Sequence, residues 1–185
     1  MEKTKIAIFD FCDTIVAKQT GDNFIDYVRS NSNSSFMEIL EFSRIILLKS
    51  KFFRVVDILF PNNSLHKRFK LVQLMGISKN NLEKFSQKYY ENDLRHNLIN
   101  DTINELKQKQ KQAYRIFIIS GGYSIYLKYF SSHFNIEIED IISTEISFDN
   151  KGKCKGRIFG LDCIGENKIV KLKLRVNSID NFDLN

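Results

Sequence analysis

Two apolar segments of this 185-residue sequence end in residue types that could carry out chemistry on a phosphate group. In the first, residues 6–9 (Ile-Ala-Ile-Phe) run directly into residues 10–14 (Asp-Phe-Cys-Asp-Thr). A carboxylate at the end of a buried parallel strand lies where α/β sheets bind ligands, beside backbone N–H groups that can hold phosphate oxygens. Asp10 is therefore a candidate nucleophile or metal ligand, although an aspartate in an ordinary strand-ending turn produces the same pattern.

The second candidate group is Ser120-Gly121-Gly122, which follows the apolar residues 115–119. It offers a hydroxyl and unhindered backbone N–H groups to one phosphoryl oxygen, or it is a simple turn between a strand and a helix. The third candidate is Lys168, whose ammonium group would neutralise charge on a phosphate and on Asp10 as a transition state forms. A single lysine among 28 basic residues also has the ordinary role of a solvated surface group.

The segments around these residues predict an α/β fold. Residues 6–9 and 115–119 are short runs rich in strand-forming residues, and the helical pattern of residues 97–112 leads into the second of them. A helix that leads into a buried strand is typical of parallel sheets. The first strand is expected to be buried, and the second to stop at Ser120.

The C-terminal half continues the alternation of helix and strand. Residues 123–134 predict a helix and residues 141–148 a strand. A hairpin turn at residues 149–152 (Asp-Asn-Lys-Gly) then leads into a strand at 154–159. We expect a helix over residues 167–176, although the apolar residues there also alternate as they would in a strand.

Residues 17–95 have mostly helical patterning and predict an inserted helical region with apolar segments at 24–28, 36–60, 65–75 and 82–94. Residues 36–60 are strongly apolar, but seven charged side chains interrupt them too often for a membrane span. We interpret this segment as a buried helix or helix pair. The alternative is a helix with a basic face that lies on a membrane surface.

Composition limits the other classes of function. The formal net charge is +6, from 28 basic and 22 acidic residues, and the lysines are spread along the chain. Such an excess suits phosphorylated substrates, nucleic acid or anionic lipid, but no DNA-binding or RNA-binding signature accompanies it. We therefore expect no nucleic-acid partner. The three cysteines include no CxxC pair and the N-terminus is charged, which predicts a reduced, cytoplasmic protein. The three histidines are isolated, which predicts that there is no structural zinc site.

Taken together and in this order, the candidate residues resemble the motifs of the haloacid dehalogenase superfamily, and especially its phosphoserine-phosphatase-like branch. The family's first motif, Asp-x-Asp-x-Thr/Val after an apolar strand, matches at Asp10 and Thr14. Residues 118–123 (Ile-Ile-Ser-Gly-Gly-Tyr) are similar to the second motif. Residues 152–168, with three further glycines before Lys168, look like the branch's approach to its third motif.

This resemblance implies a Rossmann-like parallel-sheet core with a helical cap inserted after the first strand. The core would comprise residues 1–16 and 96–185, and the cap residues 17–95. Cap residues would choose the substrate, which is expected to be a small phosphorylated metabolite. The candidates for this role, which nothing in the sequence ranks, are Asp22, Tyr27, Arg29, Arg44 and Arg54.

The same resemblance implies a magnesium-dependent phosphatase, in which Asp10 attacks phosphorus to form an aspartyl-phosphate that water then cleaves. Asp10, Cys12 and Lys168 would be the catalytic residues, and Mg²⁺ would be held by Asp10 and by the backbone carbonyl of Cys12. The implied substrate-binding residues are Phe11, Thr14, Ser120, Gly121 and Gly122.

Cys12 departs from the family pattern. The family's second aspartate of the first motif, which protonates the leaving alcohol and later activates water, falls at this position. A thiol with an unperturbed pKa of about 8.5 is a poor substitute, and the loss of general acid–base help costs roughly a hundred- to ten-thousand-fold in rate. Asp13 lies one position later and is expected to point away from the site, because side chains alternate along an extended segment.

The family's fourth motif, an acidic pair after another core strand, has no clear counterpart. Asp180 and Asp183 have tolerable spacing but no convincing apolar strand before them, and we expect the chain to end too soon, at Asn185. Two alternatives to a phosphatase therefore stay open. One is a phosphate-binding or interaction protein that has lost turnover, and the other is a phosphotransferase that passes the phosphoryl group to another alcohol.

Overall fold

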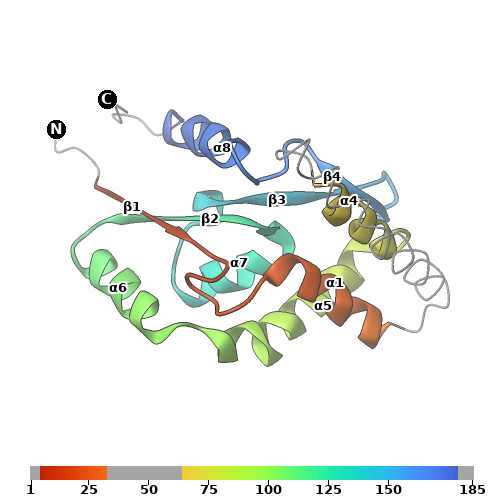
Figure 1. The fold of residues 1–185 in the computed structure, drawn as a ribbon, viewed down its shortest axis with the longest axis horizontal. Coiled ribbons are helices and arrows are strands. Elements are labelled where there is room, and N and C mark those ends of the chain that lie inside the picture. Colours follow the sequence, from red (N-terminus) through yellow and green to blue (C-terminus); the bar gives the residue numbers. More distant parts are fainter. Residues whose placement is uncertain (1–4, 33–63, 179–185) are drawn as a thin grey trace.

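The computed structural model describes residues 5–32 and 64–178, in which four strands form one sheet in the order β1-β2-β3-β4. The strands are β1 (Ile6–Asp10), β2 (Arg115–Tyr123), β3 (Ile141–Phe148) and β4 (Cys154–Phe159). The first three are parallel, and β4 pairs with β3 in the antiparallel direction. The predicted α/β class with a mostly parallel core is confirmed (Figure 1).

Helices lie on both sides of this sheet (Figure 1). They are α1 (Thr20–Asn31), α4 (Leu65–Leu71), α5 (Lys79–Asn92), α6 (Asn100–Lys111), α7 (Ser124–His133) and α8 (Asn167–Val176), with short 3-10 turns η1 (Val72–Leu74), η2 (Leu94–Asn97) and η3 (Ile138–Asp140). One face of the sheet is covered by α8, which packs against β2 and β3. The other face is covered by α6 and α7, and α5 packs against α7.

The side chains of β2 alternate between two apolar cores, as the two-residue period of a strand requires. Ile116 and Ile118 face the larger core, which includes residues of α5, α6 and α7. Phe117 and Ile119 face a smaller core that includes Val176 of α8. Because β2 has a parallel strand on each side and apolar contacts on both faces, its carboxyl end is held firmly in place.

β1 is less buried than the sequence predicts. None of its five residues is buried, and Ile8 is 48% exposed. The prediction of a buried first strand is wrong for these side chains, because within the described residues β1 pairs with β2 alone and lies at the edge of the sheet. The strand nevertheless ends at Asp10, beside the carboxyl end of β2.

β2 is longer than predicted. The sequence places the end of this strand at Ser120, but the structure continues it to Tyr123, and α7 begins at the next residue. The pairing register with β3 shifts between Ile119 and Tyr123. Residues 120–122 therefore form an irregular strand end instead of a separate turn, and such irregularities redirect side chains and release backbone groups from the ladder.

Charged side chains join α1 and α4. Lys70 Nζ lies 2.8 Å from Asp26 Oδ2, and His66 Nε2 lies 2.9 Å from Asp22 Oδ2. Burial alone would raise the pKa of Asp22, but the hydrogen bond with His66 and the charge of Lys70 outweigh it and lower that pKa. These contacts hold α1 beside α4, although residues 33–63 separate the two helices in the sequence.

Aromatic rings join α1 and α5 to α7. The ring of Phe24 in α1 lies 5.5 Å from that of Tyr89 in α5 and 5.1 Å from that of Tyr126 in α7. Tyr89 and Tyr126 also contact each other edge to face, with centroids 5.5 Å apart. The division of the chain into a core and a cap at residues 17–95 stays a prediction.

Helices or 3-10 turns of the structure cover most of each predicted helix, at residues 24–28, 65–75, 82–94, 97–112, 123–134 and 167–176. The fifth begins one residue later than predicted, because Tyr123 belongs to β2, and the last is a helix and not a strand. The predicted hairpin into β4 is also confirmed. Residues 36–60, with Arg44 and Arg54, and the acidic residues Asp180 and Asp183 lie outside the described residues. Across the described ranges, no helix is long and apolar enough to cross a membrane.

Candidate active site

A cavity of about 490 Å³ lies at the carboxyl ends of β1 and β2 and brings together residues from four separate parts of the sequence. Five residues that the sequence singles out line it: Asp10, Cys12, Gly121, Gly122 and Lys168. The lining is completed by Asp13, Gln19, Gly21, Ser64, Lys67, Ile164 and Gly165. The parallel strands explain this meeting, because parallel neighbours end at the same edge of a sheet.

Asp10 is held by two donors at one of its oxygens. Lys168 Nζ donates to Asp10 Oδ1 at 3.0 Å, and the backbone N–H of Phe11 donates to the same oxygen at 2.9 Å. The second residue of α8 is Lys168, so the packing of that helix on the sheet sets the position of its ammonium group. Oδ2 has no hydrogen bond to the described residues, which leaves it available for bonding in the cavity.

Cys12 points into a group of hydroxyls below the cavity. Its Sγ lies 3.2 Å from Thr20 Oγ1 and 4.0 Å from Ser120 Oγ. Thr20 Oγ1 also lies 2.7 Å from the hydroxyl of Tyr126, and both Thr20 and Tyr126 are fully buried. Burial raises the pKa of Tyr126, so its hydroxyl keeps its proton and remains uncharged beside Thr20.

Residues 120–122 are shaped by the same hydroxyls. The N–H of Gly122 donates to Ser120 Oγ at 2.9 Å, so the serine side chain folds back on its own segment. A Cβ on Gly122 would lie 2.2 Å from the Tyr126 hydroxyl and 2.9 Å from Thr20 Oγ1. Position 122 therefore requires glycine because the buried hydroxyls approach its α-carbon. The sequence predicted a different reason, namely that glycine leaves its backbone N–H accessible to a phosphate.

Asp13 lies in the cavity wall, contrary to the prediction that it points away. The prediction assumed an extended backbone, but the chain turns after Cys12, and Asp13 has a left-handed conformation with φ of 55°. The turn is closed by hydrogen bonds from the N–H of Asp13 to Val16 O and from the N–H of Ile15 to Phe11 O. Alternation of side chains does not hold in such a turn, and Gln19 donates a hydrogen bond to the Asp13 carboxylate.

Three of the predicted substrate-binding side chains lie away from the cavity surface. Phe11 is fully buried against Phe130, with ring centroids 5.1 Å apart, and contributes its backbone N–H. Thr14 lies in the turn after Cys12 and is not among the cavity-lining residues. Ser120 is fully buried beneath the cavity, close to Cys12.

Sequence reasoning missed two residues of the site. Thr20 is the first residue of α1, and its hydroxyl bonds to Cys12 and Tyr126. Lys67 is one of many lysines in the chain, yet it is only 9% exposed and lines the cavity. No sequence signal distinguishes Lys67 from its neighbours in α4, because its role depends on contacts across the fold.

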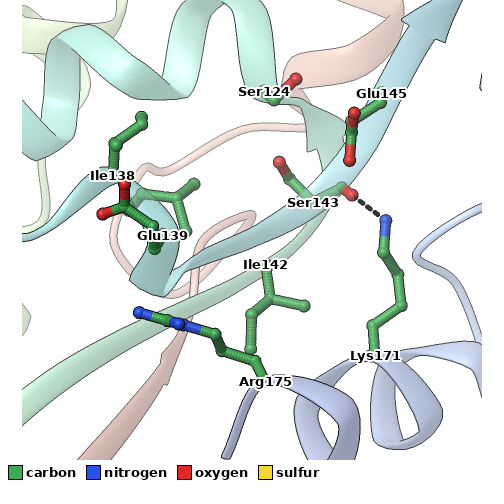
Figure 2. Close-up of a pocket in the computed structure, with 9 residues that line it drawn as sticks. Ser124, Ile138, Glu139, Ile142, Ser143, Glu145, Lys171 and Arg175 are labelled. Atoms are coloured by element: carbon green, nitrogen blue, oxygen red, sulfur yellow. Dashed lines mark hydrogen bonds between the residues drawn. The ribbon is translucent and has the colours of Figure 1, made fainter. Parts of the chain in front are cut away.

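A second cavity, of about 370 Å³, lies beside β3 and α8 (Figure 2). It is lined by Glu139 and Glu145 and contains none of the residues that the sequence singles out. Figure 2 shows Lys171 reaching from α8 to the backbone carbonyl of Ser143, at 2.5 Å. The lysine thereby provides the Ser143 carbonyl with a hydrogen-bond donor and ties α8 to β3.

A model of a known protein family matches most of the chain. Residues 7–181 match the family described as haloacid dehalogenase-like hydrolase. The chain is a member of the haloacid dehalogenase-like hydrolases. The match begins in β1 and extends past the end of α8, so it spans every element that contributes to the cavity. No curated protein sequence matches the chain.

Solved structures share the fold. A protein of unknown function from Bordetella pertussis Tohama I is similar with a TM-score of 0.76 and 15% identity, over 97% of this chain and 77% of that one. A phosphoserine phosphohydrolase-like protein from Francisella tularensis subsp. tularensis SCHU S4 has a TM-score of 0.58 and 22% identity, over 96% and 74% of the two chains. A phosphoserine phosphatase, described as a phospho-aspartyl intermediate analogue, has a TM-score of 0.52 and 16% identity, over 97% and 75%.

The residues present fit part of a magnesium site. The free Oδ2 of Asp10 and the carbonyl of Cys12, which accepts no backbone hydrogen bond in the described residues, are oxygen donors of the kind that Mg²⁺ prefers. Mg²⁺ usually keeps several waters and binds through one or two carboxylates and substrate phosphates. The described residues contain no cluster of three or more His, Cys, Asp or Glu side chains placed to hold a metal ion.

Substitution of Gly122 tests the crowded hydroxyls beneath the cavity. Gly122→Ala places a Cβ 2.2 Å from the Tyr126 hydroxyl and should lower the free energy of unfolding by about 1–3 kcal/mol, because the surroundings are overpacked. Adding Tyr126→Phe should recover part of this loss, since it removes the nearest oxygen. Gly21→Ala is the control, because its Cβ would be 3.8 Å from its nearest neighbour. Equal stability of Gly122→Ala and the wild type in urea unfolding would contradict this description.

Proposed function

We propose that this protein is a magnesium-dependent phosphomonoester hydrolase that acts on a small phosphorylated metabolite through an aspartyl-phosphate at Asp10. The observation that carries the proposal is the contact of 3.0 Å between Asp10 Oδ1 and Lys168 Nζ in a cavity also lined by Gly121 and Gly122. A carboxylate, an ammonium group and glycine N–H groups are the parts that phosphoryl transfer through an aspartate needs. Membership of a hydrolase family supports the reaction class.

In the first step of the proposed reaction, an Asp10 carboxylate oxygen forms a bond to phosphorus while the bond from phosphorus to the alcohol oxygen breaks. Lys168 holds Asp10 in place and neutralises negative charge on the phosphoryl oxygens. The backbone N–H of Gly121, at the end of β2, binds one of these oxygens, because the N–H of Gly122 is donated to Ser120 Oγ. Bound magnesium would neutralise further charge and hold a phosphate oxygen next to Asp10.

In the second step, water attacks phosphorus, the bond to the Asp10 oxygen breaks, and inorganic phosphate leaves. A general acid must protonate the leaving alcohol in the first step, and a base must take a proton from water in the second. Cys12 occupies the position that the resemblance assigns to both tasks, and its thiol is hydrogen-bonded with Thr20. Because a thiol is a poor proton donor and acceptor at neutral pH, slow turnover of alkyl phosphates is expected.

Cys12 also supports a second candidate function, a protein that binds phosphate without turning it over. The cavity would then keep Asp10, Lys168 and the glycines as a phosphate site, while the missing carboxylate at position 12 would prevent hydrolysis. Transfer of the phosphoryl group to another alcohol is a third candidate, which product analysis with an added acceptor alcohol would detect. The three cysteines are free, which supports a reducing compartment such as the cytoplasm as the proposed location.

Asp10→Asn tests the proposed nucleophile. The wild type should release phosphate from an aryl phosphate only with magnesium present, and Asp10→Asn should reduce this rate to background, because an amide oxygen is a much weaker nucleophile. Aryl phosphates suit this assay because their leaving groups need little protonation. Asp101→Asn, in an exposed part of α6, is the matched control and should keep wild-type activity. Magnesium-dependent hydrolysis that survives in Asp10→Asn would refute the proposal.

Cys12→Asp tests whether the site is an impaired enzyme or a binding site. A carboxylate at position 12 would lie close to the hydroxyls of Thr20 and Ser120, and it should raise kcat for an alkyl phosphate by roughly a hundredfold. The gain for an aryl phosphate should be smaller. Cys12→Ser is the control, because a hydroxyl keeps the size without adding an acid. A folded Cys12→Asp variant with no gain on either substrate would favour the binding protein.

A further inference from the structure

Lys67 connects the inserted region to the phosphate-binding end of β2. It belongs to α4, and its Nζ donates to Gly121 O at 2.6 Å, to Thr144 Oγ1 at 2.8 Å and to a carboxylate oxygen of Asp162. Lys67 is 9% exposed and Asp162 is 1% exposed. The three acceptors come from β2, from β3 and from the loop after β4, so one ammonium group joins α4 to three parts of the core.

The hydrogen bonds of Lys67 leave no donor for a substrate. An ammonium group has three N–H donors, and the three acceptors at the core use all of them. Burial lowers the pKa of Lys67, against the opposing effect of Asp162. Lys67 lines the cavity, but its hydrogen bonds go to protein groups around the site and not to a ligand.

The Gly121 carbonyl depends on Lys67 for a strong hydrogen bond. The pairing register between β2 and β3 shifts around this residue, so the regular ladder is interrupted there. Thr144 Oγ1 lies 3.3 Å from Gly121 O but only 2.7 Å from Asp162 Oδ1, and a hydroxyl has one proton to donate. With that proton directed to Asp162, Lys67 at 2.6 Å is the donor that fixes the carbonyl.

We propose that Lys67 is a positioning residue for the phosphate site: by holding the Gly121 carbonyl, it fixes the peptide that follows Gly121 and so constrains the N–H of Gly121, the glycine N–H that Ser120 Oγ does not use. The inference rests on the proposed function, since phosphate is the ligand assigned to this segment. It extends that function because Lys67 belongs to the inserted region. The affinity of the core for phosphate therefore depends on where α4 docks.

The alternative is that Lys67 and Asp162 form a buried ion pair with a role in stability alone. Lys67→Met by itself cannot separate the two roles, because it leaves the Asp162 carboxylate buried without a cation, which is strongly destabilising. The double variant Lys67→Met with Asp162→Leu removes both charges and should recover the melting temperature. It lacks the Lys67 ammonium, and the Thr144 hydroxyl that it releases from Asp162 lies 3.3 Å from Gly121 O. Only a longer and weaker hydrogen bond to this carbonyl remains, so the variant separates positioning from stability.

The first measurement is the affinity for inorganic phosphate, by calorimetry in the presence of magnesium. The double variant should bind phosphate roughly ten- to a hundredfold more weakly than the wild type, because small misplacements of binding groups have effects of this size. Lys70→Met is the matched control, since Lys70 is also a buried lysine of α4 but pairs with Asp26 in α1. It should bind phosphate as the wild type does. Wild-type affinity in the double variant would overturn the inference.

The second measurement does not need a ligand. Amide hydrogen exchange by NMR should be at least about tenfold faster at Gly121 and Gly122 in the double variant, because this segment loses a restraint, and unchanged in β1. Unchanged exchange at these glycines would overturn the positioning role. Failure of the double variant to fold would also overturn it and would assign the ion pair to stability. If the wild type binds no phosphate while exchange rises as expected, the proposed function fails and the restraint by Lys67 stands.

Discussion

The ion pair between Asp10 and Lys168 joins residues 158 positions apart, and the proposed chemistry depends on it. It forms because β1 and β2 are parallel and end at one edge of the sheet, while α8 packs on β2 and β3 with its first turn next to that edge. The two side chains are 43% and 29% exposed, and such pairs contribute at most about 1 kcal/mol to stability. The pair therefore adds little stability, and under the proposed function its role is chemical.

Beneath the exposed pair lies a buried polar layer. On one side, the hydroxyls of Thr20, Tyr126 and Ser120 surround the α-carbon of Gly122, and Cys12 Sγ contacts the hydroxyls of Thr20 and Ser120. On the other side, the carbonyl of Gly121 is bound by Lys67. Buried polar groups are costly unless they are hydrogen-bonded, and these groups satisfy one another. The end of β2 is thus held from two directions, as a site that binds without rearrangement requires.

The sequence predicted the parts of the fold that follow from local patterns. Apolar runs and helical periodicity identify β1 to β4 and the helices, and motif spacing identifies Asp10 and Lys168 as partners. Predictions that needed neighbours in space were less successful. The exposure of Ile8 depends on which strands pair with β1. The conformation of Asp13 depends on a turn, in which side chains do not alternate in direction as they do along an extended strand.

The contacts of Thr20 and Lys67 show the same limit. A threonine at a helix start and a lysine in a short helix have ordinary local explanations, and only the folded chain shows their partners 106 and 95 positions away. Motif spacing along the chain can therefore indicate the groups that face the ligand. The residues that hold those groups in place become visible only with the structure.

The central claim is that Asp10 accepts a phosphoryl group, and the most direct test is to find that group on the protein. The protein would be mixed with magnesium and an aryl phosphate, stopped with acid within the first turnover, and digested for mass spectrometry. A peptide that contains Asp10 and carries one phosphoryl group, absent from Asp10→Asn, is the predicted result. Substrate hydrolysis at the normal rate with no phosphorylated Asp10 peptide, in a digest that recovers a phosphoaspartyl standard, would contradict the account.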